Sequence, residues 1–221
     1  MPARRKSRES AAALGQRAGR IVERLAEAYP ARIELEFSNP LELAIATILS
    51  AQCTDARVNE VTKSLFKKYR TAEDYANADP ELLQEEIRST GFFRNKTRSI
   101  ISFARSLVEL HDGVVPKTMD ELVRLAGIGR KTANVILGSA FGVNEGIAVD
   151  THVKRVARRL ELSAESDPDK IEKDLMKLVP QDGWTDCSLR MIQHGRYRCG
   201  ARSPQCDGCA LEELCPTAGS W

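Results

Sequence analysis

Hydrophobic residues recur along this chain at intervals of three and four, the spacing that places them on one face of an α-helix. In the first such segment Leu14, Ala18, Ile21, Val22 and Leu25 share a face. No segment of useful length alternates hydrophobic and polar residues, and no Asn-Gly or Asp-Gly pair joins two strand-like runs. The pattern therefore predicts an all-α fold.

Helix-start and helix-end signals divide the chain into roughly ten short helices. A capping side chain precedes a proline at three starts, Asn39-Pro40, Asp79-Pro80 and Asp167-Pro168. The pair Thr118 and Glu121 is typical of a capping box. Gly91 and Gly113 stand where helix C-terminal caps are expected.

The composition is that of an ordinary globular protein with room for one large domain or two small ones: 221 residues, 42% hydrophobic and 29% charged. A net charge of +2 does not by itself favour a nucleic-acid partner. The total hides an uneven distribution, because Tyr69–Glu86 is acidic whereas Thr151–Leu160 and Leu189–Arg202 are basic. The charged segment of residues 1–9 is expected to be a flexible basic tail.

Membrane and secretion signals are not found. The most apolar stretch, Leu41–Ala51, is too short to span a bilayer and contains Glu42. The basic N-terminus is not followed by an apolar signal core. We therefore expect a reduced, cytoplasmic chain without a membrane partner.

Four of the six cysteines crowd the C-terminus with the spacing Cys199-x6-Cys206-x2-Cys209-x5-Cys215. Four thiolates within seventeen residues can hold one metal centre, either tetrahedral zinc or an iron–sulfur cluster. Zinc ribbons usually carry two Cys-x2-Cys knuckles and only one is present here, so the spacing favours iron–sulfur but leaves zinc open. Disulfides are the less expected alternative in a reducing compartment.

The segment around Gly127, Ile128 and Gly129 is typical of a helix, a tight turn and a second helix that begins near Arg130. The unpaired N–H groups at the start of that helix form a site suited to a phosphate. The spacing fits neither a Walker A loop nor a dinucleotide fingerprint. The alternative is a plain interhelical turn.

Lys131 follows Arg130 in the first turn of this second helix. The neighbouring cation and the positive helix end both favour its neutral amine, which is a nucleophile able to form a Schiff base. A simple phosphate contact is the alternative.

Asp150 is the expected N-cap of a further helix, and its carboxylate could also stabilise a cation developing near Lys131. On that helix Lys154, Arg155, Arg158 and Arg159 form a basic stripe that is either a duplex contact or a solvated face.

Several segments together resemble the endonuclease III family, bacterial pyrimidine-lesion DNA glycosylases of the helix-hairpin-helix superfamily. The resemblance extends over about residues 33–216 and rests on LAGIGRKTANVILGSAFG, VDTHVKR, the cysteine run, ILSAQCTD and GFFRNK. It implies two domains around a DNA cleft. Residues 34–144 would form a six-helix barrel with the helix-hairpin-helix, and residues 10–33 with 145–221 would form a domain whose four cysteines hold a 4Fe-4S cluster.

The resemblance also implies roles for single residues. Lys131 matches the catalytic nucleophile and Asp150 its partner carboxylate. Gln52 matches the residue that fills the gap left by a flipped nucleotide, Phe92 stands where the family often has a leucine wedge, and His152 lines the DNA side of the pocket. The remaining DNA contacts are expected to come from the hairpin and from two segments rich in basic residues: Gly127, Ile128, Gly129, Arg130, Lys154, Arg155, Arg196, Arg198 and Arg202. Ala126 departs from the usual proline of the hairpin.

The expected function is therefore base-excision repair by a monomeric enzyme associated with the nucleoid. Its partner would be double-stranded DNA containing damaged pyrimidines or abasic sites. Two alternatives stand beside it, a non-catalytic iron–sulfur DNA-binding or redox-sensing module and a monofunctional mismatch glycosylase. Relatives of the second kind lack a lysine at the position of Lys131.

Overall fold

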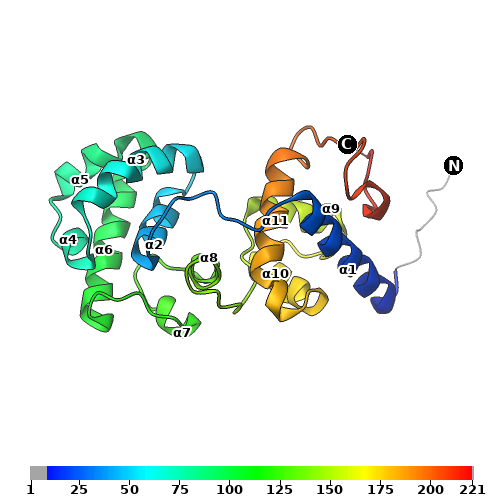
Figure 1. Ribbon diagram of the computed structural model, residues 1–221, viewed down its shortest axis with the longest axis horizontal. Coiled ribbons are helices and arrows are strands. Elements are labelled where there is room, and N and C mark those ends of the chain that lie inside the picture. Colours follow the sequence, from blue (N-terminus) through cyan, green and yellow to red (C-terminus); the bar gives the residue numbers. More distant parts are fainter. Residues whose placement is uncertain (1–8, 221) are drawn as a thin grey trace. The chain divides into compact units, whose positions relative to one another are not determined.

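The computed structural model describes residues 9–220, and this part of the chain is helical. It contains eleven α-helices and three short 3-10 helices (Figure 1). Residues 9–220 form no strand, and their only β-type pairing is an isolated bridge between Cys199 and Pro204. The predicted all-α fold is confirmed. The described residues form two compact units, residues 33–145 and residues 9–32 with 146–220.

The unit of residues 33–145 is built from seven α-helices and one 3-10 helix. Its elements are α2 (Pro40–Leu49), α3 (Asp55–Lys68), α4 (Ala72–Ala76), α5 (Pro80–Ile87), η1 (Arg88–Thr90), α6 (Phe93–His111), α7 (Met119–Leu122) and α8 (Arg130–Phe141). The longest helix, α6, packs against α2, α4 and α5. Its Ile100, Phe103 and Leu107 are fully buried in this unit's core, so α6 organises the unit.

The expected helix starts of this unit are present. The Asn39 side chain accepts the backbone N–H of Glu42, and Asp79 caps α5 in the same way. Thr118 accepts the N–H of Glu121 but donates its own hydroxyl to that carboxylate, so the reciprocal half of the predicted capping box is not formed.

The second unit combines helices from both ends of the chain. Its elements are α1 (Ala11–Ala28), α9 (Thr151–Arg159), α10 (Pro168–Leu178), η2 (Gln181–Gly183), α11 (Trp184–Tyr197) and η3 (Glu212–Leu214). Helix α1 packs against α10 and α11, so the two chain ends share one core (Figure 1). Ile21 of α1 and Met191 of α11 are both buried in that core.

Helices α9 and α11 cross closely at Gly195. A Cβ atom built there would lie 2.9 Å from the Cβ of His152 and 3.2 Å from a terminal guanidinium nitrogen of Arg155. Only glycine fits this crossing. The close approach places the end of α11, and with it the loop that starts at Cys199, against α9.

No helix within residues 9–220 is both long and apolar enough to cross a membrane. The expected basic tail lies outside the described residues except for Glu9, which forms an ion pair with Arg17. The assignment of a barrel domain to residues 34–144 and a cluster domain to the rest stays a prediction.

Candidate nucleic-acid interface and cysteine-lined cavity

The glycine hairpin connects α7 to α8, and its two glycines have different roles. Gly127 has a φ of +79°, a conformation that strains any residue with a side chain. Gly129 is the N-cap of α8 with a φ of −90°, and a Cβ atom there would meet no atom within 4 Å. Nothing within this unit therefore requires glycine at position 129, so the space in front of it is open to a partner.

Ile128 lies between the two glycines and points into the core, and its N–H donates to the carbonyl of Leu125 at 3.1 Å. The side chain and the N–H of Ile128 are thus both used inside the unit, and its expected contact with DNA stays a prediction. The N–H groups of Gly127 and Gly129 donate to no acceptor within the described residues. The anion site predicted here thus has two available loop N–H groups, followed by the first turn of α8.

Lys131 occupies that first turn and its side chain is exposed. The predicted start of the second helix at Arg130 is confirmed. The hairpin therefore presents an amine directly beside the two available N–H groups.

Gln52 and Phe92 share an unusual backbone. Both lie in the left-handed region, with φ of 53° and 47°, and both are exposed. Non-glycine residues in this region carry strain that is concentrated at functional sites. The neighbouring Phe93 instead packs against the core of the unit. Of the two phenylalanines, Phe92 is the one held out toward solvent, with 60% of its surface exposed.

The turn that carries Phe92 is held by a buried lysine. Lys96 is only 4% exposed, and its Nζ donates to the carbonyl of Thr90 at 2.7 Å. Burial lowers the pKa of Lys96, and the nearby Cys53 opposes this effect. Sequence reasoning did not give Lys96 this role, although the residue belongs to the GFFRNK segment.

Asp150 caps α9 with one carboxylate oxygen. Its Oδ1 accepts the backbone N–H groups of His152 and Val153, both at 2.8 Å. The predicted N-cap is confirmed. The other oxygen accepts no hydrogen bond from any residue that the structure describes. One half of the carboxylate thus holds the helix while the other half is available for chemistry.

The basic stripe of α9 is not a continuous surface. Arg155 donates from Nε to the carbonyl of Cys199 at 3.0 Å and from a terminal nitrogen to the carbonyl of Gly195 at 2.7 Å. Arg159 is buried. These donors of Arg155 thus bind carbonyls of α11 and of the loop after it, and its expected contact with DNA stays a prediction. Lys154 and Arg158 remain at the surface of the helix.

His152 lies beside Arg155, whose guanidinium nitrogen is 3.2 Å from its Nδ1. Burial lowers the pKa of His152, Asp150 raises it, and the charges of Arg155 and Arg196 lower it further. The ring is therefore neutral at pH 7.

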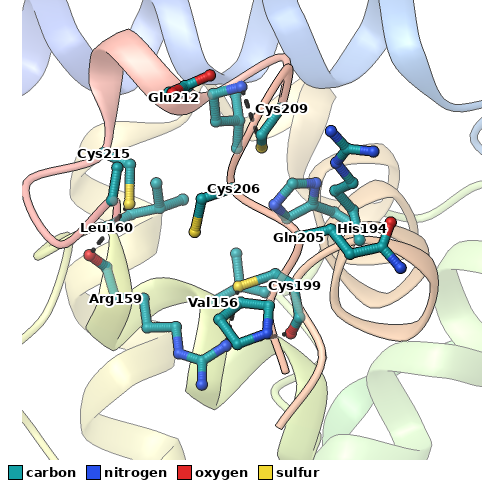
Figure 2. Close-up of a pocket in the computed structure, with 14 residues that line it drawn as sticks. Val156, Arg159, Leu160, His194, Cys199, Gln205, Cys206, Cys209, Glu212 and Cys215 are labelled. Atoms are coloured by element: carbon teal, nitrogen blue, oxygen red, sulfur yellow. Dashed lines mark hydrogen bonds between the residues drawn. The ribbon is translucent and has the colours of Figure 1, made fainter. Parts of the chain in front are cut away.

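The four C-terminal cysteines line one cavity of about 30 Å³ between the loop of residues 199–215 and helix α9. Figure 2 shows their side chains arranged around this space, with Val156 of α9 and Leu160, which directly follows α9, beside it. Gly208, with a φ of +67°, allows the tight turn between Cys206 and Cys209. The loop thus brings all four predicted ligands to one cavity, although no three His, Cys, Asp or Glu side chains in residues 9–220 are arranged to hold a metal ion.

Two cationic side chains, Arg159 and Arg198, lie beside the cavity. Arg159 donates from Nη1 to the Sγ of Cys199 at 3.2 Å and to the carbonyl of Gly200 at 2.7 Å. Arg198 also lines the cavity, and its Nε is buried without a hydrogen-bond partner in the described part of the chain. The expected contact of Arg198 with DNA stays a prediction. Four sulfurs, two guanidinium groups and apolar walls form a donor set that suits an iron–sulfur cluster.

The two remaining cysteines lie apart from this loop. Cys187 is buried in the core, where burial raises the pKa of its thiol to about 12. Cys53 is half-buried beside Gln52. None of the six cysteines forms a disulfide, which removes the disulfide alternative for this structure.

The predicted site residues are divided between the two units. One unit carries Gln52, Phe92, Gly127, Gly129, Arg130 and Lys131. The other carries Asp150, His152, Lys154, Arg155 and the cysteine loop. Sequence reasoning missed Gly195 as the crossing point of α9 and α11. The isolated glycine inside a helical pattern was the available signal.

Comparison with known proteins gives a consistent result. Residues 45–181 match the family described as HhH-GPD superfamily base excision DNA repair protein. The chain is 51% identical over 204 residues to Endonuclease III of Synechocystis sp., covering 92% of this chain and 93% of that protein. Two solved structures match with a TM-score of 0.89 and 47% identity, over 93% of this chain and 97% of theirs. One is a non-covalent Endonuclease III–DNA complex and the other a trapped Endonuclease III–DNA covalent intermediate.

Proposed function

This chain belongs to the endonuclease III family of the HhH-GPD superfamily of base excision DNA repair proteins, and from that premise we propose how its own residues remove a damaged base. The chain is a DNA glycosylase whose partner is damaged duplex DNA. The proposal concerns the residues that bind the duplex, those that act on the flipped nucleotide, and the group held by the cysteines.

The glycine hairpin binds a phosphate of the duplex. The N–H groups of Gly127 and Gly129 donate to no described acceptor, so they and the first turn of α8 can bind this anion, and Arg130 adds positive charge. The open space in front of Gly129 supports this role, because a phosphate needs close access to the backbone. Lys154 adds a further phosphate contact and salt-dependent affinity.

Gln52 and Phe92 enter the base stack when the damaged nucleotide swings out. Their exposed, left-handed positions support this role, since a side chain held away from the core is ready to insert. Flipping costs a few kcal/mol and costs least for a lesion that already stacks poorly. His152 lines the DNA side of the pocket as a neutral ring.

Lys131 then attacks the sugar. Its Nζ forms a bond to C1′, the C1′–N bond breaks, and the base leaves with the electron pair. Opening of the sugar ring gives a Schiff base between Nζ and C1′. Loss of a C2′ proton and cleavage of the 3′ C–O bond complete the β-elimination, and water releases the lysine. The trapped covalent complex of the 47% identical relative supports this order of reaction steps.

Asp150 supplies the second functional group. Its unbonded oxygen stabilises positive charge on the sugar as the base departs, as the carboxylates of glycosidases do. It also accepts the proton that Lys131 releases. The geometry that supports this role is the division of the carboxylate into one oxygen that caps α9 and one that does not.

Cys199, Cys206, Cys209 and Cys215 hold a 4Fe-4S cluster. All four side chains line one cavity, and their spacing lacks the second Cys-x2-Cys knuckle of a zinc ribbon, which supports a cluster over a single zinc ion. When bound, the cluster would hold the loop that packs on α9, and base removal would be left to Lys131 and Asp150.

We further propose that the enzyme is a cytoplasmic, nucleoid-associated monomer whose substrates are oxidised pyrimidines and abasic sites. The observation that carries the proposed chemistry is the exposed Lys131 in the first turn of α8, beside the available N–H groups. The test is base release and strand cleavage on duplexes with an oxidised pyrimidine, an abasic site or a mismatch. Base release without strand cleavage would instead identify a monofunctional glycosylase.

A further inference from the structure

Arg198 has a buried hydrogen-bond donor that the protein itself does not use. Its Nε is inaccessible to solvent and donates to no acceptor within residues 9–220, although the side chain lines the cavity between the four cysteines and α9. Buried donors are nearly always paired, so an unpaired one requires an explanation.

The guanidinium of Arg198 is held in place by the cysteine loop. Its Nη2 donates to the carbonyl of Asp207, and its own carbonyl accepts the N–H of Gln205 at 3.0 Å. The Nη2 atom of Arg198 also lies 3.6 Å from the position that a Cβ would take at Gly208. Arg198 is thus fixed against the turn between Cys206 and Cys209.

The cavity offers sulfur atoms as acceptors, because four of its lining residues are the cysteines. Its lining also includes His194, Gln205 and Glu212, but none of these side chains accepts the Nε–H of Arg198. A buried N–H donor, a fixed cation and sulfur acceptors are thus gathered in one cavity.

We propose that Arg198 is a positioning residue that donates its Nε–H to sulfur of the iron–sulfur cluster and raises the reduction potential of that cluster. The inference rests on the proposed function, since it requires the cluster to be held by the four cysteines. A donor and a positive charge next to the sulfurs stabilise the more negative, reduced form. Removing them therefore favours the oxidised form.

Arg159 is the less suitable residue for a test even though it already donates to the Sγ of Cys199. The same guanidinium supports the carbonyls of Gly200 and Ala201, so its loss would open the loop as well. Arg198 makes one such loop contact, with Asp207. Its substitution changes the electrostatics of the cavity with less effect on the fold.

The experiment is a redox titration of the purified full-length protein without DNA, followed by electron paramagnetic resonance. It compares wild type, R198M, R198K and the control R202M, which removes the same charge three residues from Cys199 at an exposed position. We expect R198M to shift the ratio of reduced to oxidised cluster about tenfold toward the oxidised form at fixed potential, about 59 mV for one electron. R198K, which keeps the charge but loses the Nε–H, should shift less, and R202M should match wild type.

Iron and acid-labile sulfide are counted in every sample. A wild-type protein without iron would contradict the proposed cofactor, and with it this inference. An intact wild-type cluster with an unchanged potential in R198M, or an equal shift in R202M, would overturn the role of Arg198 alone. If R198M does not retain iron, the potential of R198K is the deciding measurement. A potential of R198K below that of wild type supports the role of Arg198, and a potential equal to that of wild type overturns it.

Discussion

The Oδ1 atom of Asp150 accepts the backbone N–H of Val153 at 2.8 Å and so begins helix α9. The second oxygen of the same carboxylate is bonded to no described residue. The roles of the two oxygens can therefore be distinguished by mutation to asparagine, because an asparagine caps a helix about as well as an aspartate but carries no charge.

D150N is predicted to remain folded and to lose activity. The free energy of unfolding should change by less than about 0.5 kcal/mol, because the amide oxygen still accepts the two N–H groups. The rate of base release should fall about 100-fold or more, as when a group that stabilises transition-state charge is removed. Urea unfolding and single-turnover excision measure the two effects.

Asp167 provides the matched control for this variant. It caps α10 through one oxygen that accepts the N–H groups of Asp169 and Lys170, both at 3.1 Å. D167A should cost about 1 kcal/mol of stability with unchanged excision. Wild-type excision by D150N would show that Asp150 acts only as a cap.

The two hairpin glycines are predicted to respond differently to alanine. G127A should lose about 1–2 kcal/mol of stability because its φ is +79°. G129A should change stability by less than about 1 kcal/mol, because the restricted unfolded chain favours alanine whereas the N-cap position favours glycine. G129A should nevertheless bind duplex DNA about tenfold more weakly, since its methyl group blocks the phosphate.

Thermal unfolding and DNA titration at fixed salt measure these effects. The control is G15A in α1, where a Cβ also meets nothing within 4 Å. G15A should gain stability without a change in DNA affinity. If G129A bound DNA as tightly as G15A does, the hairpin would not be the phosphate site.

Phe92 and Phe93 are predicted to have different roles: Phe92 inserts into the base stack, and Phe93 packs in the core. F92G should raise the free energy of unfolding by about 1 kcal/mol, because glycine relieves the left-handed backbone. It should weaken binding to lesion DNA about tenfold through lost stacking. F93A should instead cost about 2 kcal/mol of stability, since its ring packs on the core. Stronger loss of lesion binding in F93A, after correction for unfolded protein, would assign the wedge to Phe93.

The protonation of His152 is predicted to depend on Asp150. Burial lowers the pKa of His152 while the Asp150 charge raises it, so D150N should lower this pKa further. NMR titration of the ring measures the change, and D167N should leave it unaltered.

The same histidine has a defined effect on stability. Because its pKa is lower in the folded chain than the ordinary value of 6.5, the unfolded chain binds more protons between the two values. Its contribution to stability is therefore complete above pH 6.5 and is lost as the pH falls through that window. Between pH 8 and pH 5.5, H152Q should lose less free energy of unfolding than wild type does, as measured by urea unfolding at the two pH values. An equal loss of stability in both proteins would contradict this account.

Local signals were sufficient to predict several parts of the fold and site. The caps at Asn39, Asp79 and Asp150 depend on a side chain and the next few residues, and they formed as predicted. The start of α8 at Arg130 followed from the glycine before it. The left-handed backbone of Gln52 and Phe92 left no such local signal.

Features that depend on packing between distant segments were not predictable in the same way. Arg155 and Arg159 belong to a stripe that the sequence shows as basic surface, yet their guanidinium groups are used by the loop after α11. The N–H of Ile128 in the hairpin likewise donates to the carbonyl of Leu125. In each case the competing partner is a backbone carbonyl, which sequence spacing does not reveal.

The central claim is that Lys131 is the nucleophile, and the most direct measurement is borohydride trapping on lesion duplexes. Reduction of the Schiff base should link wild-type protein to DNA covalently. K131A should give no adduct, while K154A, also on a helix near its N-terminus, should give the adduct at reduced DNA affinity. An adduct of undiminished yield from K131A would contradict the account.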